Sequence, residues 1–213
     1  MKEEWARGLV VRVLKEAVRR SGSGGVVIAG QGPEADLLSR WVSQAGIPSR
    51  SPSPKAVALA RELLGATSPS REDPAPPGRA DPTALASLAL ARQVGFLLLG
   101  TATKTTLLLS PDLPLEPVLP LGDLFATDVL AIQGRCTVPR PLEDAHEEML
   151  RAVDTGLQEF LEEGTRPAEA LPAVVDPLRS ILVEALQKSR SSRISHYLVP
   201  MLRGPTPGID LDL

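Results

Sequence analysis

A single cysteine, Cys136, occurs among the 213 residues, so the chain can form neither an intramolecular disulfide nor a zinc site built from cysteines. We expect Cys136 to be a small core residue. Histidine is also rare: His146 lies in an acidic segment and His196 lies near the end of the sequence. This placement suggests neither a metal-binding pair nor a catalytic base, and we expect both side chains at the surface.

An excess of basic residues is also missing, because the net charge is −3 and acids and bases are spread along the sequence. We therefore expect no nucleic-acid partner and no anionic membrane partner. The longest apolar runs, such as residues 96–99, are too short to span a bilayer. The sequence does not open with a charged segment followed by an apolar one, so we find no signal peptide and expect cytoplasmic residence.

Apolar residues are plentiful: 43% of the residues are hydrophobic, which predicts one globular domain over residues 1–213. Apolar periodicity, helix-starting prolines and glycine stops predict helices at residues 3–20, 33–45, 54–64, 82–94, 123–132, 142–163 and, with interruptions, 167–193. Clustered prolines and glycines predict a proline-rich loop at residues 66–82 and an extended tail at residues 200–213.

Two short segments, residues 25–29 and 96–99, are apolar on both faces if they form strands. Such strands are typical of the buried interior of a parallel sheet. The helical segments between them are long enough to serve as crossover connections, which place helices on both faces of the sheet. The sequence therefore predicts an α/β fold with a helical C-terminal part.

The first predicted strand leads through a glycine loop, residues 30–32, into a helix that begins with Pro33. Proteins with α/β folds often bind a phosphate at such a loop, because backbone amides point out of the helix N-terminus. Glu34 and Asp36 follow, and their carboxylates make this position less attractive to an anion. The loop is therefore either the remains of an anion site or only a tight strand-to-helix turn.

Three segments, read together, resemble NAD synthetase, the ammonia-dependent ligase of the ATP pyrophosphatase group. The clearest is Gly-Phe-Leu-Leu-Leu-Gly-Thr-Ala-Thr-Lys-Thr-Thr at 95–106, followed by Pro-Val-Leu-Pro-Leu at 117–121 and Ala-Thr-Asp-Val at 126–129. The second runs from residue 153 to Gln-Lys-Ser-Arg-Ser-Ser-Arg at 187–193. The third is the opening helix, strand and glycine loop. The resemblance thus spans most of the chain.

The resemblance implies a Rossmann-like three-layer sandwich with a mainly parallel sheet of about five strands and ATP at the carboxyl edge of that sheet. The positions that match the family's nucleotide-binding loops are Gly30, Gln31, Gly32, Glu34, Gly100, Thr101 and Lys104. The resemblance also implies a homodimer. The apolar stripe predicted for the helix at residues 142–163 favours the same assembly, because one small domain would have difficulty burying it alone.

The sequence departs from the family's motifs at positions that hold phosphate and metal. Gly30 and Ala35 stand where the family has serines, and Pro33 removes a backbone donor. Thr106 stands at the metal-binding glutamate, and Ala126 stands at a lysine. Because Mg²⁺ prefers carboxylate oxygens, we expect at most weak binding of ATP and Mg²⁺ and assign no residue a metal-binding or catalytic role.

Two functional hypotheses follow from these matches and departures. In the first, the chain is a catalytically degenerate NAD synthetase-like protein that acts as a binding or regulatory module, with at most weak adenine-nucleotide binding. In the second, it is still an ammonia-dependent, ATP-using ligase, or a nucleotide hydrolase, that works with a reduced set of groups. The loss of phosphate and metal ligands favours the first. Lys104, which survives, is either a nucleotide contact or a solvated lysine near the sheet edge.

Overall fold

The computed structural model describes residues 3–64, 81–109, 118–139, 142–143, 146–162 and 178–191, together with residues 166, 169, 171, 174 and 176. Its helices are α1 (Glu3–Ser21), α2 (Pro33–Gln44), α3 (Pro54–Leu63), α4 (Pro82–Val94), α5 (Lys104–Leu109), α6 (Ala126–Gln133), α7 (Glu147–Glu162) and α8 (Leu178–Ser191). Its strands are β1 (Val26–Ile28), β2 (Ser49–Arg50) and β3 (Leu97–Leu99). The predicted proline-rich loop, apart from its last two residues, and the predicted tail lie outside the described residues.

The strands form a parallel sheet with the order β2-β1-β3, in which Val26 of β1 lies opposite Ser49 on one side and Leu97 on the other. One further parallel bridge joins Leu99 to Val118. The part of the chain that the structure describes therefore holds three strands, fewer than the expected five or so. The α/β class and the parallel sheet are confirmed.

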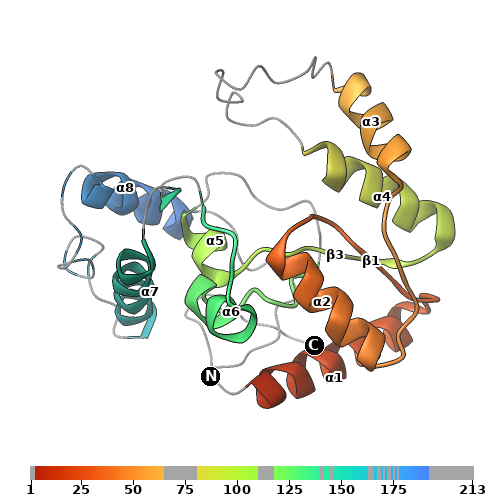
Figure 1. The fold of residues 1–213 in the computed structure, drawn as a ribbon, viewed down its shortest axis with the longest axis horizontal. Helices are drawn as coiled ribbons and strands as arrows, with labels where there is room; N and C mark the ends of the chain where they lie inside the picture. The colour runs from red at the N-terminus through yellow and green to blue at the C-terminus, as the bar shows by residue number, and fades with distance from the viewer. Residues whose placement is uncertain are drawn as a thin grey trace.

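The two faces of the sheet are covered by different helices: Figure 1 shows α1 and α2 on one side and α4, with α3 packed beyond it, on the other. Val26 and Ile28 belong to the apolar cluster that α1 and α2 build. Val27 and Ala29 point the other way and pack with residues of α4. This alternation follows from the two-residue period of a strand, and it explains why β1 is apolar at every position.

The helix starts agree with the prolines and caps in the sequence. Pro54 and Pro82 occupy the first helical positions of α3 and α4. The Ser53 hydroxyl accepts a hydrogen bond from the backbone N–H of Ala56 at 3.2 Å, and Asp81 Oδ1 accepts one from the N–H of Thr83 at 2.9 Å. These caps satisfy amide groups that the helix itself leaves without acceptors.

Helices α5 to α8 form a second apolar cluster beside the sheet, at the opposite end of the molecule from α3 and α4 (Figure 1). The stripe of α7 lies inside this cluster, where Leu150, Val153, Leu157 and Phe160 are buried and Met149 and Leu161 pack at its edge. The expectation that one domain would leave this stripe uncovered is therefore wrong. The second cluster also explains the helical C-terminal part that the sequence predicted.

The described helices include none that is both long enough and apolar enough to cross a bilayer.

Candidate functional site

The carboxyl edge of the sheet brings together the glycine loop after β1 and the Gly100-Thr101 segment after β3. The backbone N–H of Ala29 donates to the carbonyl of Leu99 at 2.8 Å, which holds the two strand ends side by side. Gly30 has a φ of 111°, and a Cβ built on it would lie 2.7 Å from Thr101 Oγ1. Only glycine fits this position, because the backbone conformation and the approach of Thr101 both exclude a side chain.

The remaining loop residues differ in what surrounds them. Gln31 and Gly32 are exposed, and Gly32 has a φ of 98° at the start of α2. The backbone N–H of Gly100 donates to the carbonyl of Val118 at 2.8 Å, so the bridge beyond β3 already uses this amide. The structure thus gathers the predicted residues at one edge of the sheet, but Gly100 has no amide left to offer a phosphate.

Glu34, in the first turn of α2, is only 3% exposed. Its carboxylate accepts a hydrogen bond from the backbone N–H of Thr137 at 2.7 Å and another from the Thr137 hydroxyl. Nearby, Gln133 Nε2 donates to the carbonyl of Pro33 at 2.7 Å, and Arg135 forms an ion pair with Asp36 at 2.8 Å. These hydrogen bonds and this ion pair therefore hold the end of α6 and the segment after it against the first turn of α2.

Lys104, at the start of α5, is buried rather than solvated, with 8% of its surface exposed. Its ammonium group forms an ion pair with Asp123, which is 1% exposed, and lies 5.5 Å from the centre of the Phe125 ring. The backbone N–H of Lys104 donates to the carbonyl of Leu124 at 2.7 Å. The expectation of a solvated lysine is therefore wrong, because the turn before α6 supplies a carboxylate that the local sequence around Lys104 does not reveal.

The N-terminus of α6 has three side-chain acceptors, one from α6 itself, one from α5 and one from α7. Asp128 Oδ2 accepts from the backbone N–H of Phe125 at 3.0 Å, and Thr105 Oγ1 accepts from the N–H of Ala126 at 2.8 Å. Asp154 of α7 accepts from the N–H of Thr127 at 2.9 Å and from the Thr105 hydroxyl at 2.7 Å. These bonds satisfy the amides that a helix N-terminus would otherwise offer to an anion.

Asp154 is the buried carboxylate of this cluster that the sequence did not single out. Burial raises the pKa of its carboxyl group, while the hydrogen bonds from Thr105 and Thr127 lower that pKa in part. Its separation from Thr105 is 49 residues, so no local pattern could have linked the two. Its contacts are those of a cap on α6.

Thr106 offers a hydroxyl where the resemblance places a metal-binding carboxylate, and this hydroxyl lies 3.1 Å from Thr103 Oγ1. The described part of the chain contains no group of three or more His, Cys, Asp or Glu side chains that could hold a metal ion. Together with the pairing of Lys104 and Asp123, this arrangement does not fit a bound Mg²⁺–pyrophosphate, whose charge needs carboxylates for the metal and cations for the phosphates.

Cys136 and His146 take no part in the hydrogen bonds and ion pairs described above. Cys136 is half-buried and packs against both apolar clusters. Its burial, with a smaller contribution from the charge of Glu34, raises the pKa of the thiol to about 11, so the thiol is protonated and unreactive at neutral pH. His146 is exposed, as expected. His196 and the last residues of the predicted box at 187–193 lie outside the described residues.

The fold is similar to that of the NH3-dependent NAD synthetase from Campylobacter jejuni subsp. jejuni NCTC 11168, whose structure is in complex with the nitrate ion. This match has a TM-score of 0.54 at 14% sequence identity, and it covers 89% of this chain and 96% of that chain. In sequence, the chain matches no family model and no curated protein. The resemblance drawn from the sequence motifs is thus confirmed for the fold, while an identity this low carries no information about activity.

Proposed function

We propose that the chain is an NAD synthetase-like protein that no longer carries out ATP-dependent amide ligation and acts as a binding or regulatory module. At most it binds an adenine nucleotide weakly. The observation that carries this proposal is the buried ion pair between Lys104 and Asp123. A lysine already neutralised by a carboxylate inside the protein can neutralise a phosphate only after that pair is broken.

Two further features of the carboxyl edge support the proposal. The first amides of α6 already bond to Asp128, Thr105 and Asp154. Thr106, which bonds to Thr103, brings no negative charge for a metal. Ligation of this kind requires that the protein binds the leaving pyrophosphate and neutralises its charge in the transition state. At this edge, the hydrogen-bond donors and the charged groups are already engaged in contacts within the protein.

The test is a turnover assay with purified protein, deamido-NAD, ammonia, ATP and Mg²⁺, in which we expect no NAD above background. Each missing transition-state donor typically costs about 10²- to 10³-fold in rate, and although such losses are not additive, two of them suffice to bring turnover close to background. Isothermal titration with ATP and Mg²⁺ measures nucleotide binding separately, and there we expect weak binding or none.

Matched variants separate this proposal from the alternative of a ligase with a reduced set of groups. Pro33→Gly combined with Ala35→Ser restores one backbone amide and one hydroxyl, and we expect no rescue, because Thr106 still provides no charge. Steady turnover by the unmodified protein that Lys104→Met combined with Asp123→Ala removes, while circular dichroism shows that the double variant is folded, would establish the alternative. Steady turnover that Thr106→Glu leaves unchanged would show that these positions are not aligned with the family's site.

We also propose that the chain forms a homodimer, as the resemblance implies. The apolar stripe of α7 no longer supports this assembly, because α7 buries it against its own chain. Light scattering at micromolar concentration tests the proposal, and a mass of 22.6 kDa, that of one chain, would refute it.

A further inference from the structure

The solvent face of α1 carries the largest local excess of positive charge among the described residues. Residues 7–20 contain five basic side chains and one acid, a net charge of +4, so the rest of a chain with a total of −3 carries −7. The opposite face of α1 is committed to the core, where Ala6, Val10 and Leu14 are fully buried. The basic residues therefore form a surface that does not fold back onto the sheet.

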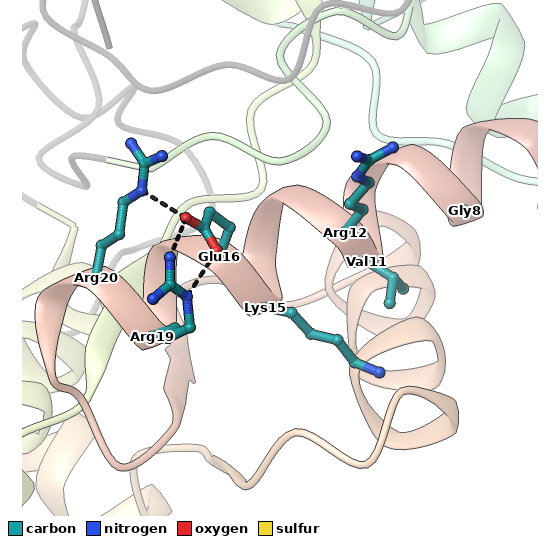
Figure 2. Close-up of a pocket in the computed structure, with 7 residues that line it drawn as sticks. All are labelled: Gly8, Val11, Arg12, Lys15, Glu16, Arg19 and Arg20. Atoms are coloured by element: carbon teal, nitrogen blue, oxygen red, sulfur yellow. Dashed lines mark hydrogen bonds and ion pairs between the residues drawn. The ribbon is translucent and has the colours of Figure 1, made fainter.

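This surface, which we call the α1 basic face, has a shallow hollow lined by Gly8, Val11, Arg12, Lys15, Glu16, Arg19 and Arg20 (Figure 2). Gly8 leaves open space, since a Cβ built on it would meet nothing within 4 Å. Trp5, one turn before Gly8, is 53% exposed. Residues three, four and seven apart share one side of a helix, so Trp5, Gly8 and Arg12 lie in one row.

Two of the cations are fixed in place, and two have no carboxylate partner. Arg19 donates from Nε at 2.9 Å and from Nη2 at 2.6 Å to the Glu16 carboxylate, and Arg20 donates to the same carboxylate at 2.6 Å. The Arg19 hydrogen bond, followed by that of Arg20, lowers the pKa of Glu16 to about 2, so Glu16 stays ionised. In the described part of the chain, neither Arg12 nor Lys15 forms an ion pair, and Figure 2 shows both extending away from Glu16.

We propose that the α1 basic face binds a short acidic segment of a partner protein, with carboxylates one helical turn apart and an apolar side chain between them. Arg12, Lys15 and Arg19 are spaced three and four residues apart, which is about 4.5 and 6 Å along the helix axis. Carboxylates at the same spacing on a helical partner meet these cations in register. The hollow at Gly8 and Val11 receives the apolar side chain, and Trp5 and the arginines belong to the residue types that dominate binding energy at protein interfaces.

The same observations argue against two other polyanionic partners. A long nucleic acid would extend past the α1 basic face onto the remainder of the protein, whose net charge is −7. An anionic membrane surface needs an apolar face that inserts below the headgroups, whereas the apolar side chains opposite the basic face are buried in the core. A short segment with a few carboxylates meets neither obstacle. The proposal goes beyond the proposed function, because it does not depend on what the carboxyl edge binds.

Tryptophan fluorescence can report binding to the α1 basic face, because the chain contains two tryptophans that differ in exposure. Trp5 is exposed, and Trp41 is 0% exposed. The test ligand is a blocked helical peptide with glutamates alternately three and four residues apart and leucines beside them. Saturable protection of Trp5 from acrylamide quenching, weakening as salt is raised, is the expected result. Arg12→Glu with Lys15→Glu should weaken the apparent affinity by at least about tenfold, whereas Glu16→Gln, which releases Arg19 and Arg20, should strengthen it by about threefold.

The matched control is Lys55→Glu with Arg61→Glu, which makes the same change of charge at exposed positions on α3. This control should leave the affinity within about twofold, since α3 is separated from the α1 basic face by the sheet. Equal weakening by both pairs of substitutions would overturn the proposal, and so would the absence of saturable binding by the unmodified protein. Protection of Trp5 by single-stranded DNA or by phosphatidylserine vesicles, but not by the peptide, would also overturn it. Circular dichroism verifies that each variant keeps its helices.

Discussion

At the carboxyl edge of the sheet, Lys104 lies buried against Asp123, whereas on α1 the side chains of Arg12 and Lys15 extend into solvent with no ion pair among the described residues. Both regions carry cations that a phosphate or carboxylate could meet. They differ in whether the protein has already supplied the anion. A charge that the fold neutralises stabilises the protein or holds a turn, while a charge left exposed is available to a partner.

The difference also separates architecture from available charge. The carboxyl edge has an architecture in which a glycine loop and a second loop lie side by side, and the fold as a whole is similar to that of an NAD synthetase. However, its hydrogen-bonding and charged groups are engaged in contacts within the protein, such as the hydrogen bonds of Glu34 with Thr137 and of Asp154 with Thr127. The α1 basic face has no such architecture, but its arginines and lysine are accessible.

Removing the carboxylate of Asp123 should have the largest effect on stability. Asp123→Ala leaves the Lys104 ammonium buried without its ion-pair partner, and breaking a buried pair in this way costs about 3–5 kcal/mol. Urea unfolding followed by circular dichroism measures the loss.

The control is the double variant Lys104→Met with Asp123→Ala, which removes both charges. We expect it to recover a large part of the stability lost in the single variant. A loss below about 1 kcal/mol for Asp123→Ala would mean that Lys104 reaches water and behaves as a surface cation. The carboxyl edge would then resemble α1, and the comparison would fail.

A substitution at Gly30 should have the next largest effect, because it tests whether the loop is a tight turn. Gly30→Ala places a side chain at a φ of 111° and 2.7 Å from Thr101 Oγ1. Backbone strain of this kind costs about 1–3 kcal/mol, and the contact with Thr101 puts the expected loss at the upper end of that range. Adding Thr101→Ala relieves the contact but not the strained φ, so thermal unfolding should show a partial recovery. Full tolerance of Gly30→Ala would instead indicate an open, adaptable loop.

Two of the three described strands and most of the described helices could be predicted from the sequence because their signals are local. The runs at residues 25–29 and 96–99 contain β1 and β3, and the prolines at 33, 54 and 82 begin α2, α3 and α4. Strand β2 was missed because it is two residues long and both are exposed, so it has no apolar pattern. Helix α5 was missed because it spans only six residues, three of them a Leu run that also suits a strand.

The candidate site could be predicted only as a set of positions. The motifs placed Gly30, Thr101 and Lys104 at one edge of the sheet; the structure brings Gly30 against Thr101, whereas Lys104 pairs with Asp123. What each side chain does there depends on partners from distant parts of the chain. Thr137 lies 103 residues from Glu34, and Asp154 lies 27 residues from Thr127. Contacts of this kind are set by the packing of whole helices, which no short sequence pattern records.

Replacing Asp154 should have an intermediate effect that depends on pH. Asp154→Asn keeps one acceptor for the α6 cap but loses the other, and leaving one buried donor without an acceptor costs about 1–2 kcal/mol near neutral pH. Burial raises the pKa of Asp154 above its ordinary value of 3.8, so the native protein binds this proton at a higher pH than the unfolded chain does. The stability of the unmodified protein therefore falls as pH rises from about 3.8 through the raised pKa.

Asparagine does not titrate, so the difference in stability between the two proteins should be largest near pH 3.8 and shrink as the pH rises through that window. Urea unfolding at a series of pH values measures it. A difference that grows with pH would mean that the folded state favours the charged carboxylate, and that the capping hydrogen bonds outweigh burial at this position.

The smallest expected effect is at Gly8, where the comparison between the two regions can be tested with the same substitution as at Gly30. Gly8→Ala adds a Cβ that meets nothing within 4 Å, in the interior of an exposed helix turn. Alanine loses less backbone freedom than glycine on folding, so we expect a gain of about 0.5–1 kcal/mol in the free energy of unfolding. The added methyl group also fills the hollow of the α1 basic face and should weaken binding of the acidic peptide by about threefold, since a partner must then lie farther from Val11. Thermal unfolding and the Trp5 quenching assay measure the two quantities on one protein sample. Higher stability with unchanged affinity would show that the peptide does not enter the hollow, and that charge alone accounts for its binding to α1.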